Sequence, residues 1–121
     1  GPNDAGNTAL CLAEFYNQGI ARQTSKPGTR HHCTSVLPRT GLGGGQAAFD
    51  AFQSAANADL ASKFAVATAV PHYFLAATPA TAGYHGCYFW HDETVVLEDW
   101  AHPDLATRQV FAARMAAIMG L

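Results

Sequence analysis

The feature that most constrains the fold of this chain is an amphipathic stretch over residues 46–67. Its apolar side chains recur every three or four positions: Phe49, Phe52, Ala56, Leu60 and Phe64. This spacing predicts a long helix with one apolar face, which needs a second layer of structure to cover it. Asn57 or Asp59 is a point at which the helix could divide in two, and Pro71 ends the pattern.

Two further helices are expected near the ends of the chain. The first covers residues 8–18, with Asn7 or Thr8 as its N-cap and Gly19 near its C-terminus. The last starts at Pro103, a favoured first helical position. Its predicted buried stripe consists of Phe111, Met115 and Ile118.

The rest of the chain predicts loops and short strands. Residues 23–45 are rich in Thr, Ser, Pro and Gly and predict mostly loop, with a short strand near residues 32–37. A second strand is expected over residues 72–76. The order of helix, loop, helix, strands and helix predicts one α+β domain over residues 1–121 with a small antiparallel sheet.

Residues 83–100 predict a β-hairpin with a histidine where it opens. The return strand, over residues 94–99, carries three β-branched side chains at its start. Pairing of the two strands would bring His85 beside Glu98 or Asp99, with the choice set by the register. A carboxylate in that position fixes the tautomer of the imidazole and stabilises the imidazolium. The alternative is that backbone groups satisfy His85 and that both acids lie in solvent before the last helix.

Cys11 is the candidate nucleophile that such a pair would need. It falls in or just after the first turn of the predicted N-terminal helix, where the positive end of the helix dipole favours a thiolate. Backbone amides at a helix start can hold an oxyanion, and Asn7 or Asn3 would add a side-chain amide donor. The alternative is that Cys11 packs inward beside Leu10 and Leu12 as a small apolar residue.

Three segments carry a resemblance to a known family: Asn7 to Ala13, Tyr84 to Phe89 and Val96 to Asp99. A cysteine at the start of an N-terminal helix, followed by a histidine that opens a hairpin ending in an acid, resembles the papain-like cysteine hydrolases. The resemblance is to the compact branches of that superfamily, which are viral leader proteases, bacterial toxin amidases and effector deamidases. The chain departs from the family pattern at Leu12, because an aromatic residue commonly follows the nucleophile.

The resemblance implies a Cys-His-Asp/Glu triad that hydrolyses amide bonds. Cys11 would be the nucleophile, His85 the general base, Asp99 or Glu98 the acid that orients the imidazole, and Asn7 an oxyanion donor. The leaving amine would be a peptide nitrogen or the ammonia of a glutamine side chain, so protease, amidase and deamidase activities stay open. The implied substrate is protein, peptide or peptidoglycan, with no metal and no cofactor.

Two other chemical interpretations use overlapping residues. Histidines and cysteines supply ligand types for zinc without the paired spacing of a specific motif. They are His31, His32, Cys33, His85, Cys87 and His91. The tripeptide His85-Gly86-Cys87 also resembles the cysteine motif of L,D-transpeptidases, which implies Cys87 as the nucleophile. Tyr88 follows it, whereas that motif usually carries an arginine soon after its cysteine.

A third interpretation is a non-enzymatic interaction or immunity-type module. Four aromatic residues would build its binding face: Tyr84, Tyr88, Trp90 and Trp100.

The 121-residue chain has a net charge of −2 and scattered Lys and Arg, which excludes the electrostatic pattern of a nucleic-acid partner. It contains no signal peptide and no run of about 18 apolar residues, so no membrane span is expected.

The odd number of cysteines does not by itself determine whether the protein resides in an oxidising or a reducing compartment. In an oxidising compartment we expect Cys33 to bridge Cys87 and Cys11 to stay free. That pairing would suit a protein that is secreted or delivered into a host or target cell. Gly1 and Pro2 are typical of the remnant of a cleaved tag, so the natural chain is expected to start later or to belong to a larger polyprotein or toxin.

Overall fold

The computed structural model describes residues 7–66, 73–76, 83–89 and 95–120. The elements in chain order are α1 (Thr8–Ser25), β1 (His32–Thr34), the 3₁₀ turn η2 (Gly43–Gly45), α2 (Gln46–Lys63), β2 (Phe64–Val66), β3 (Tyr73–Ala76), β4 (Gly86–Tyr88) and α4 (Leu105–Met119). The expected α+β class is confirmed. In the described part of the chain, no helix is long and apolar enough to cross a membrane.

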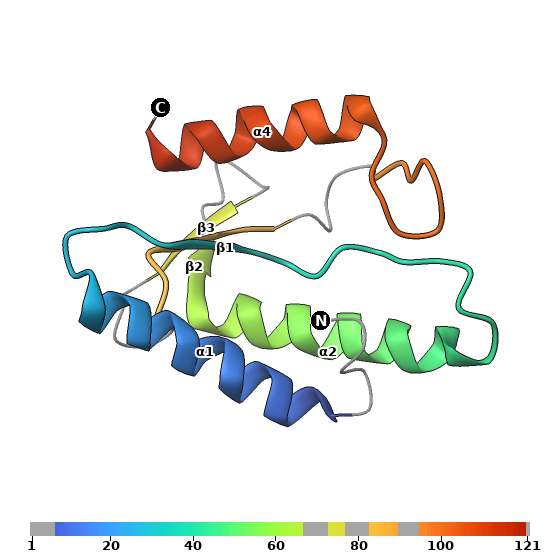
Figure 1. Cartoon of the computed structure of the whole chain (residues 1–121), viewed down its shortest axis with the longest axis horizontal. Coiled ribbons are helices and arrows are strands. Elements are labelled where there is room, and N and C mark those ends of the chain that lie inside the picture. Colours follow the sequence, from blue (N-terminus) through green and yellow to red (C-terminus); the bar gives the residue numbers. More distant parts are fainter. Residues whose placement is uncertain (1–6, 67–72, 77–82, 90–94, 121) are drawn as a thin grey trace.

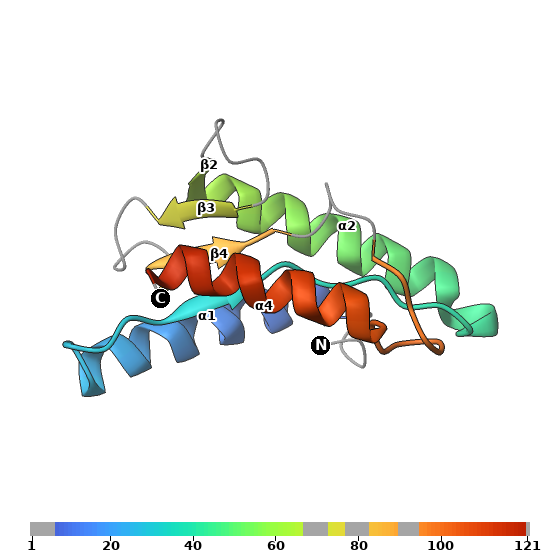
Figure 2. The same cartoon turned by 90° about the horizontal axis from the view of Figure 1, so that it is seen from above.

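The elements form three layers (Figures 1 and 2). Helices α1 and α2 lie on one face of the small sheet, and α4 covers the other face. Side chains of the sheet alternate between the two faces. Cys33 and Cys87 pack in one apolar cluster with Leu60 of α2 and Phe15 of α1, whereas Tyr88 makes an edge-on ring contact with Phe111 of α4, with centroids 5.3 Å apart.

The sheet is mixed, with the strand order β1-β4-β3-β2. β4 runs parallel to β1 on one side and antiparallel to β3 on the other. The prediction of an antiparallel sheet therefore holds for β2, β3 and β4, but not for β1. Because both edges of β4 are occupied, a return strand over residues 94–99 has no place beside it, and the predicted hairpin is wrong. Of its described residues, Leu97 instead forms an isolated bridge with Pro103.

Helices α1 and α2 both end at residues other than those predicted. α1 continues past Gly19 to Ser25, because this buried glycine serves packing rather than termination. A Cβ at position 19 would lie 2.6 Å from Cε2 of Tyr84, so the glycine permits the close approach of the chain before β4. α2 ends at Lys63, and Phe64 is already extended because it begins β2, which pairs with β3.

Helix α2 is a single helix packed by the predicted stripe. Phe49, Phe52, Ala56 and Leu60 are all buried. Asn57 and Asp59 do not divide the helix, and their half-buried side chains bond to other parts of the chain. The hydroxyl of Tyr16 in α1 donates to Asp59 at 2.7 Å and ties the two helices together.

The last helix starts two residues later than predicted. Asp104 is its N-cap, and its carboxylate accepts a hydrogen bond from the Thr107 amide. These bonds hold the pKa of Asp104 below its usual value, chiefly through the amide of Thr107. Pro103 stays outside the helix because it pairs with Leu97.

Candidate functional site

The predicted nucleophile lies near the start of α1. Asn7 is the N-cap of this helix and is exposed, and its side chain makes no capping hydrogen bond. Cys11 follows one turn later and is partly buried. It packs against the apolar cluster of Phe49, Phe52 and Ala56, on the side of α1 that faces α2. Leu12 packs against the same cluster, whereas Leu10 is 72% exposed, so the alternative of inward packing holds for Cys11 beside Leu12 but not beside Leu10.

The predicted base lies at the other end of the same helix. Nδ1 of His85 is 3.0 Å from Nε2 of Gln23, near the C-terminus of α1. It also accepts a hydrogen bond of 3.0 Å from the backbone amide of His31. Twelve residues of helix separate Cys11 from Gln23, which corresponds to about 18 Å along the axis. The structure therefore does not bring Cys11 and His85 together.

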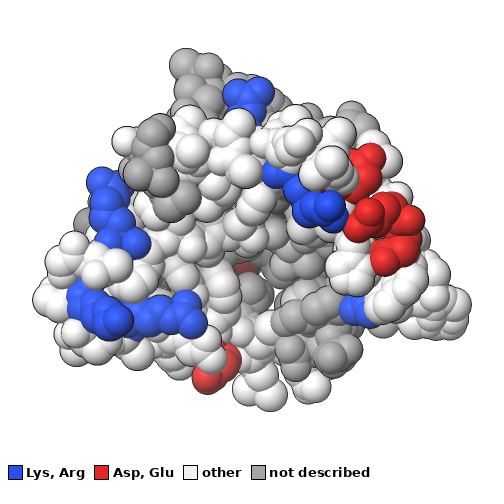
Figure 3. Space-filling view, turned by 45° about the horizontal axis from the view of Figure 1, so that its top comes forward, with Lys and Arg blue, Asp and Glu red and all other residues white. Residues whose placement is uncertain are grey.

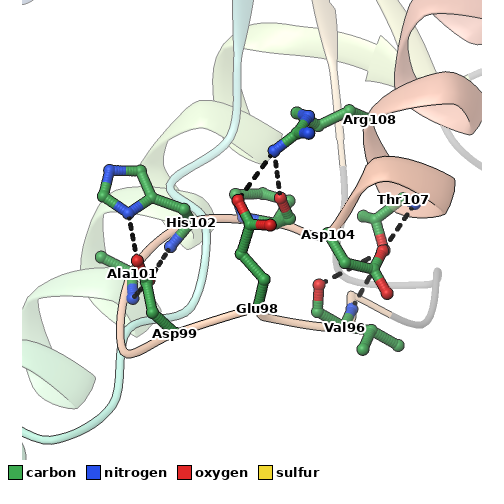
Figure 4. Close-up of polar contacts among 9 residues, drawn as sticks. Val96, Glu98, Asp99, Ala101, His102, Asp104, Thr107 and Arg108 are labelled. Carbon is green, nitrogen blue, oxygen red and sulfur yellow. Dashed lines mark hydrogen bonds and ion pairs between the residues drawn. The ribbon is translucent and has the colours of Figure 1, made fainter.

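The two candidate acids lie in a third place, in the loop before α4 (Figure 4). Glu98 forms an ion pair of 2.9 Å with Arg108. Asp99 accepts hydrogen bonds of 2.7 Å from the amides of Ala101 and His102, and it pairs with Nδ1 of His102 at 2.7 Å. The two backbone amides, followed by His102, lower the pKa of Asp99 to about 2. Neither acid contacts His85.

The sequence contained a signal for these contacts that the hairpin prediction passed over. An Asp that bonds the amides two and three residues later forms an Asx turn, and Asp99 precedes His102 by three residues. His102 was not among the predicted site residues, nor was Gln23, the partner of His85. Nothing in the local sequence pairs Gln23 with His85, since the two lie far apart in the chain.

The cysteines of the sheet are neighbours without being bonded. Cys33 and Cys87 are opposite each other in the parallel register of β1 and β4, and all three cysteines are free thiols. The neighbouring Cys33 thiol, followed by burial, raises the pKa of Cys87 far above its usual value. This fully buried thiol is thus a poor nucleophile, which argues against the transpeptidase-like role.

The zinc interpretation finds no assembled ligand set. Among the described residues, no three His, Cys, Asp or Glu side chains are grouped so that they could hold a metal ion. His91 and Trp90 lie outside the described residues. Of the four aromatic residues proposed for a binding face, Tyr84 and Tyr88 are buried, and Trp100 is 48% exposed.

A cleft of about 560 Å³ lies away from all of these residues. One wall is apolar and consists of Val36, Pro38, Phe89 and Val95. The other lining residues belong to α2. They are the alanines Ala58 and Ala61 and four polar residues at helical spacing: Asp50, Gln53, Ser54 and Asn57. Its volume falls within the range of about 300–1,000 Å³ that is usual for ligand sites.

The segment over residues 35–42, which follows β1, forms the rim of this cleft and runs alongside α2 (Figure 1). Asn57 holds it there as a strand partner would. Its Oδ1 accepts from the amide of Val36 at 2.8 Å, and its Nδ2 donates to the carbonyl of Val36 at 3.2 Å. Nε2 of Gln53 donates to the same carbonyl at 3.0 Å. The cleft therefore has a preformed wall.

Other polar atoms of the α2 residues that line the cleft are available to a ligand. Oδ1 of Asp50 accepts from Gln46. Within the described part of the chain, Oδ2 of Asp50, Oε1 of Gln53 and the hydroxyl of Ser54 make no side-chain hydrogen bond. No Lys or Arg is among the described residues that line the cleft. It thus offers hydrogen-bond acceptors and one carboxylate beside an apolar surface.

Comparison with known proteins adds no constraint on this site. No protein-family model, no curated protein and no solved structure matches the chain.

Proposed function

We propose that this chain is a binding module that holds a short peptide segment in the cleft between α2 and the segment over residues 35–42. The observation that carries the proposal is the pairing of an apolar wall with a row of acceptors on α2. An extended peptide presents amide donors along its backbone and apolar side chains beside them, so it matches both walls. A phosphate-bearing ligand fits poorly, since the lining residues include a carboxylate and no cation.

The cysteine hydrolase activity stays a prediction. It depends on a meeting of Cys11, His85 and an acid, and the described contacts hold these residues in three separate places. A binding module needs none of these contacts. The peptide-binding proposal also agrees with the earlier alternative of a non-enzymatic interaction module, with a different set of residues at the binding face.

The test uses a display library of short random peptides and a variant that fills the cleft. Ala58 lines the cleft from α2, so Ala58→Phe places a ring in it. Ala55 is an equally exposed alanine of α2 outside the lining, so Ala55→Phe is the matched control. We expect selected peptides to bind Ala58→Phe at least tenfold more weakly than the wild type, a loss of about 1.4 kcal/mol or more. Binding to Ala55→Phe should be unchanged.

Two results would contradict the proposal. One is a library that yields no peptide preferring the wild type over Ala58→Phe. The other is a selected peptide that both phenylalanine variants bind equally well, since its site would then lie elsewhere. Thermal unfolding of both variants checks that neither substitution has disturbed the fold.

A further inference from the structure

Three histidines meet where the two parallel strands begin. We call His31, His32 and His85 the histidine joint. β1 starts at His32 and β4 at Gly86, and these two residues are partners in the parallel register. Just before them, the amide of His85 donates to the carbonyl of His31 at 2.7 Å. The amide of His31 in turn donates to Nδ1 of His85 at 3.0 Å. The imidazole therefore takes the place of a backbone acceptor between the two strands.

The contacts of His85 require a neutral ring. A backbone amide is always a donor, so Nδ1 must keep its lone pair to accept from His31. Nε2 of Gln23 approaches the same nitrogen at 3.0 Å and also donates. The hydrogen of the ring is thus assigned to Nε2. A proton added to Nδ1 would face two donors and remove the link between the strands.

His32 is equally unsuited to a charge. Both of its ring nitrogens are buried and have no hydrogen-bond partner in the described part of the chain, and the same is true of Nε2 of His31. A protonated His32 would bury two donors without acceptors, which is costly. Burial, and next the charge of Arg30, holds the pKa of His32 and of His85 below the usual 6.5.

The charged groups on α1 and on the loop before β1 that flank the joint are cations. α2, whose Leu60 packs in one cluster with Cys33 and Cys87, carries both Lys63 and Asp59, the carboxylate that accepts from the hydroxyl of Tyr16. α1 carries Arg22 and Lys26 at its C-terminal end, and the loop before β1 carries Arg30. α4, on the other face of the sheet, carries only Arg108 and Arg114 as charged residues. Tyr84 is also close to the joint, and burial raises the pKa of its hydroxyl above the usual value.

Among the described contacts, no carboxylate bonds to the ring of His31, His32 or His85. The sequence has no Asp or Glu between Glu14 and Asp50. Figure 3 shows Lys and Arg side chains on the left of the view with an acidic side chain close to them, and the main group of acidic side chains on the right beside further Lys and Arg side chains. Protonation of the joint would add positive charge close to Arg30, whose charge already opposes it.

We propose that the histidine joint is an acid-sensitive latch that holds β1 on β4 and releases it when His32 and His85 take up protons. β1 can leave without dismantling the sheet, because among the described strands it lies at the edge and pairs with β4 alone. Its release would also loosen the segment over residues 35–42, which would lose the bond from Ser35 to Tyr88 but keep the bonds of Val36 to Asn57 and Gln53. This segment contributes Val36 and Pro38 to the apolar wall of the cleft. The effect on the cleft rests on the proposed function, whereas the release of β1 does not.

The direction of the pH effect follows from the lowered pKa values. A histidine that is neutral in the latched state and free to bind a proton when released favours the latched state above pH 6.5. That preference is lost as the pH falls from 6.5 toward the lower pKa of the latched state. Each such histidine lowers the ratio of latched to released protein by up to about tenfold per pH unit in this window.

Hydrogen exchange at single amides tests the latch. The amides of Ser35 and His85 bond across β1 and β4, to Tyr88 and His31. We expect their protection factors to fall by up to about a hundredfold between pH 7.5 and 5.5, since two histidines act over about one pH unit. The amides between β3 and β4 should stay protected. Unchanged protection of Ser35 and His85 would overturn the latch, and so would an equal loss in all four strands.

Variants assign the effect to the histidines. In His85→Asn the Oδ1 atom can accept where Nδ1 did, and His32→Phe removes the buried nitrogens, so neither new residue titrates. The double variant should keep β1 protected at pH 5.5. His102→Asn is the matched control, because His102 is 67% exposed, pairs with Asp99 and lies outside the joint; it should behave as the wild type. If the double variant does not fold, the ring titrations of the wild type decide, and values at or above 6.5 for His32 and His85 would overturn the proposal.

The two proposals fail in different ways. If no peptide binds at pH 7.5, the cleft proposal fails while the exchange of β1 is still measurable. If peptides bind at pH 7.5 and equally well at pH 5.5, and β1 stays protected, only the latch fails.

Discussion

At the scale of single residues, the most sharply constrained position is Gly19. It lies inside α1, where alanine would usually be preferred by about 1 kcal/mol. Here an added Cβ would lie 2.6 Å from the ring of Tyr84 and 2.8 Å from the carbonyl oxygen of Gly83. The Tyr84 ring is itself fixed, because it stacks on Phe15 and its hydroxyl donates to the Phe15 carbonyl. The glycine thus sets the spacing between α1 and the chain that leads into β4.

We therefore predict that Gly19→Ala destabilises the protein despite its helical position. The overpacking should outweigh the gain in helix propensity and leave a net loss of about 1–2 kcal/mol in the free energy of unfolding. Urea unfolding measures this loss. Gly28→Ala is the control, because no atom lies within 4 Å of a Cβ built there. A Gly19→Ala variant as stable as the wild type would mean that Tyr84 and Gly83 can move aside.

Asn57 is the second informative residue, because its side-chain amide bonds both backbone groups of Val36 as a neighbouring strand would. Asn57→Ala would leave the amide of Val36 without its partner and weaken the bonding of the carbonyl. We expect a loss of about 1–3 kcal/mol in the free energy of unfolding. Asn17→Ala on α1 is the control, because Asn17 is exposed and shares the same change in helix propensity. Equal stability of the two variants would show that the Asn57 bonds contribute nothing net.

At the scale of elements, prediction from the sequence succeeded where the pattern was local. The stripe of Phe49, Phe52, Ala56 and Leu60 predicted the buried face of α2. The strands near residues 32 and 73 were also expected, and β1 and β3 lie there. The failures concern ends and partners. Phe64 continues the helical spacing but starts β2, because pairing with Ala76 in β3 overrides it.

The predicted hairpin is wrong because β4 pairs with a strand that is distant in the sequence, and a local sequence pattern does not report such pairing. Adjacent strands in a chain usually pair, and this rule placed the strand after residue 93 beside β4. β4 instead pairs with β1, which lies more than 50 residues earlier. The candidate triad depended on that hairpin, so the error in strand pairing also separated His85 from Glu98 and Asp99.

The register of β1 and β4 also makes the cysteine pair testable. Neighbouring strands lie about 4.8 Å apart, within the range of Cα separations of about 4.4–6.8 Å that a disulfide spans. We predict that oxidation with diamide links Cys33 to Cys87 and leaves Cys11 free. The reaction should be slow, because both thiols are buried and the pKa of Cys87 is raised. The link should stabilise the protein by about 4 kcal/mol for a loop of about 50 residues. A Cys11 bridge in the peptide map would contradict the prediction.

At the scale of the whole molecule, the proposals place function on the two sides of β1. The cleft lies where the chain leaves this strand, and the histidine joint lies where the chain enters it. Cys11 takes no part in either. Its sulfur packs among Phe49, Phe52 and Ala56, in a cluster that supports α1 on α2.

Cys11→Ala accordingly separates binding from hydrolysis. We expect this variant to bind the selected peptides as the wild type does. Its free energy of unfolding should fall by about 1 kcal/mol, because the smaller side chain makes fewer packing contacts. Peptide titration and urea unfolding measure the two quantities. A wild-type amidase or protease activity that disappears in Cys11→Ala would instead support the cysteine hydrolase and count against a module that only binds.

The position of β4 in the sequence has a consequence for the nascent chain during synthesis. β4 is one of the two inner strands of the described sheet, and it emerges from the ribosome after β1, β2 and β3. Until residues 86–88 appear, β1 has no hydrogen-bonded neighbour, and the edge of β3 that β4 will occupy is open. A nascent chain that stops short of Gly86 would then expose strand edges to other chains, so synthesis beyond this point protects the molecule from aggregation.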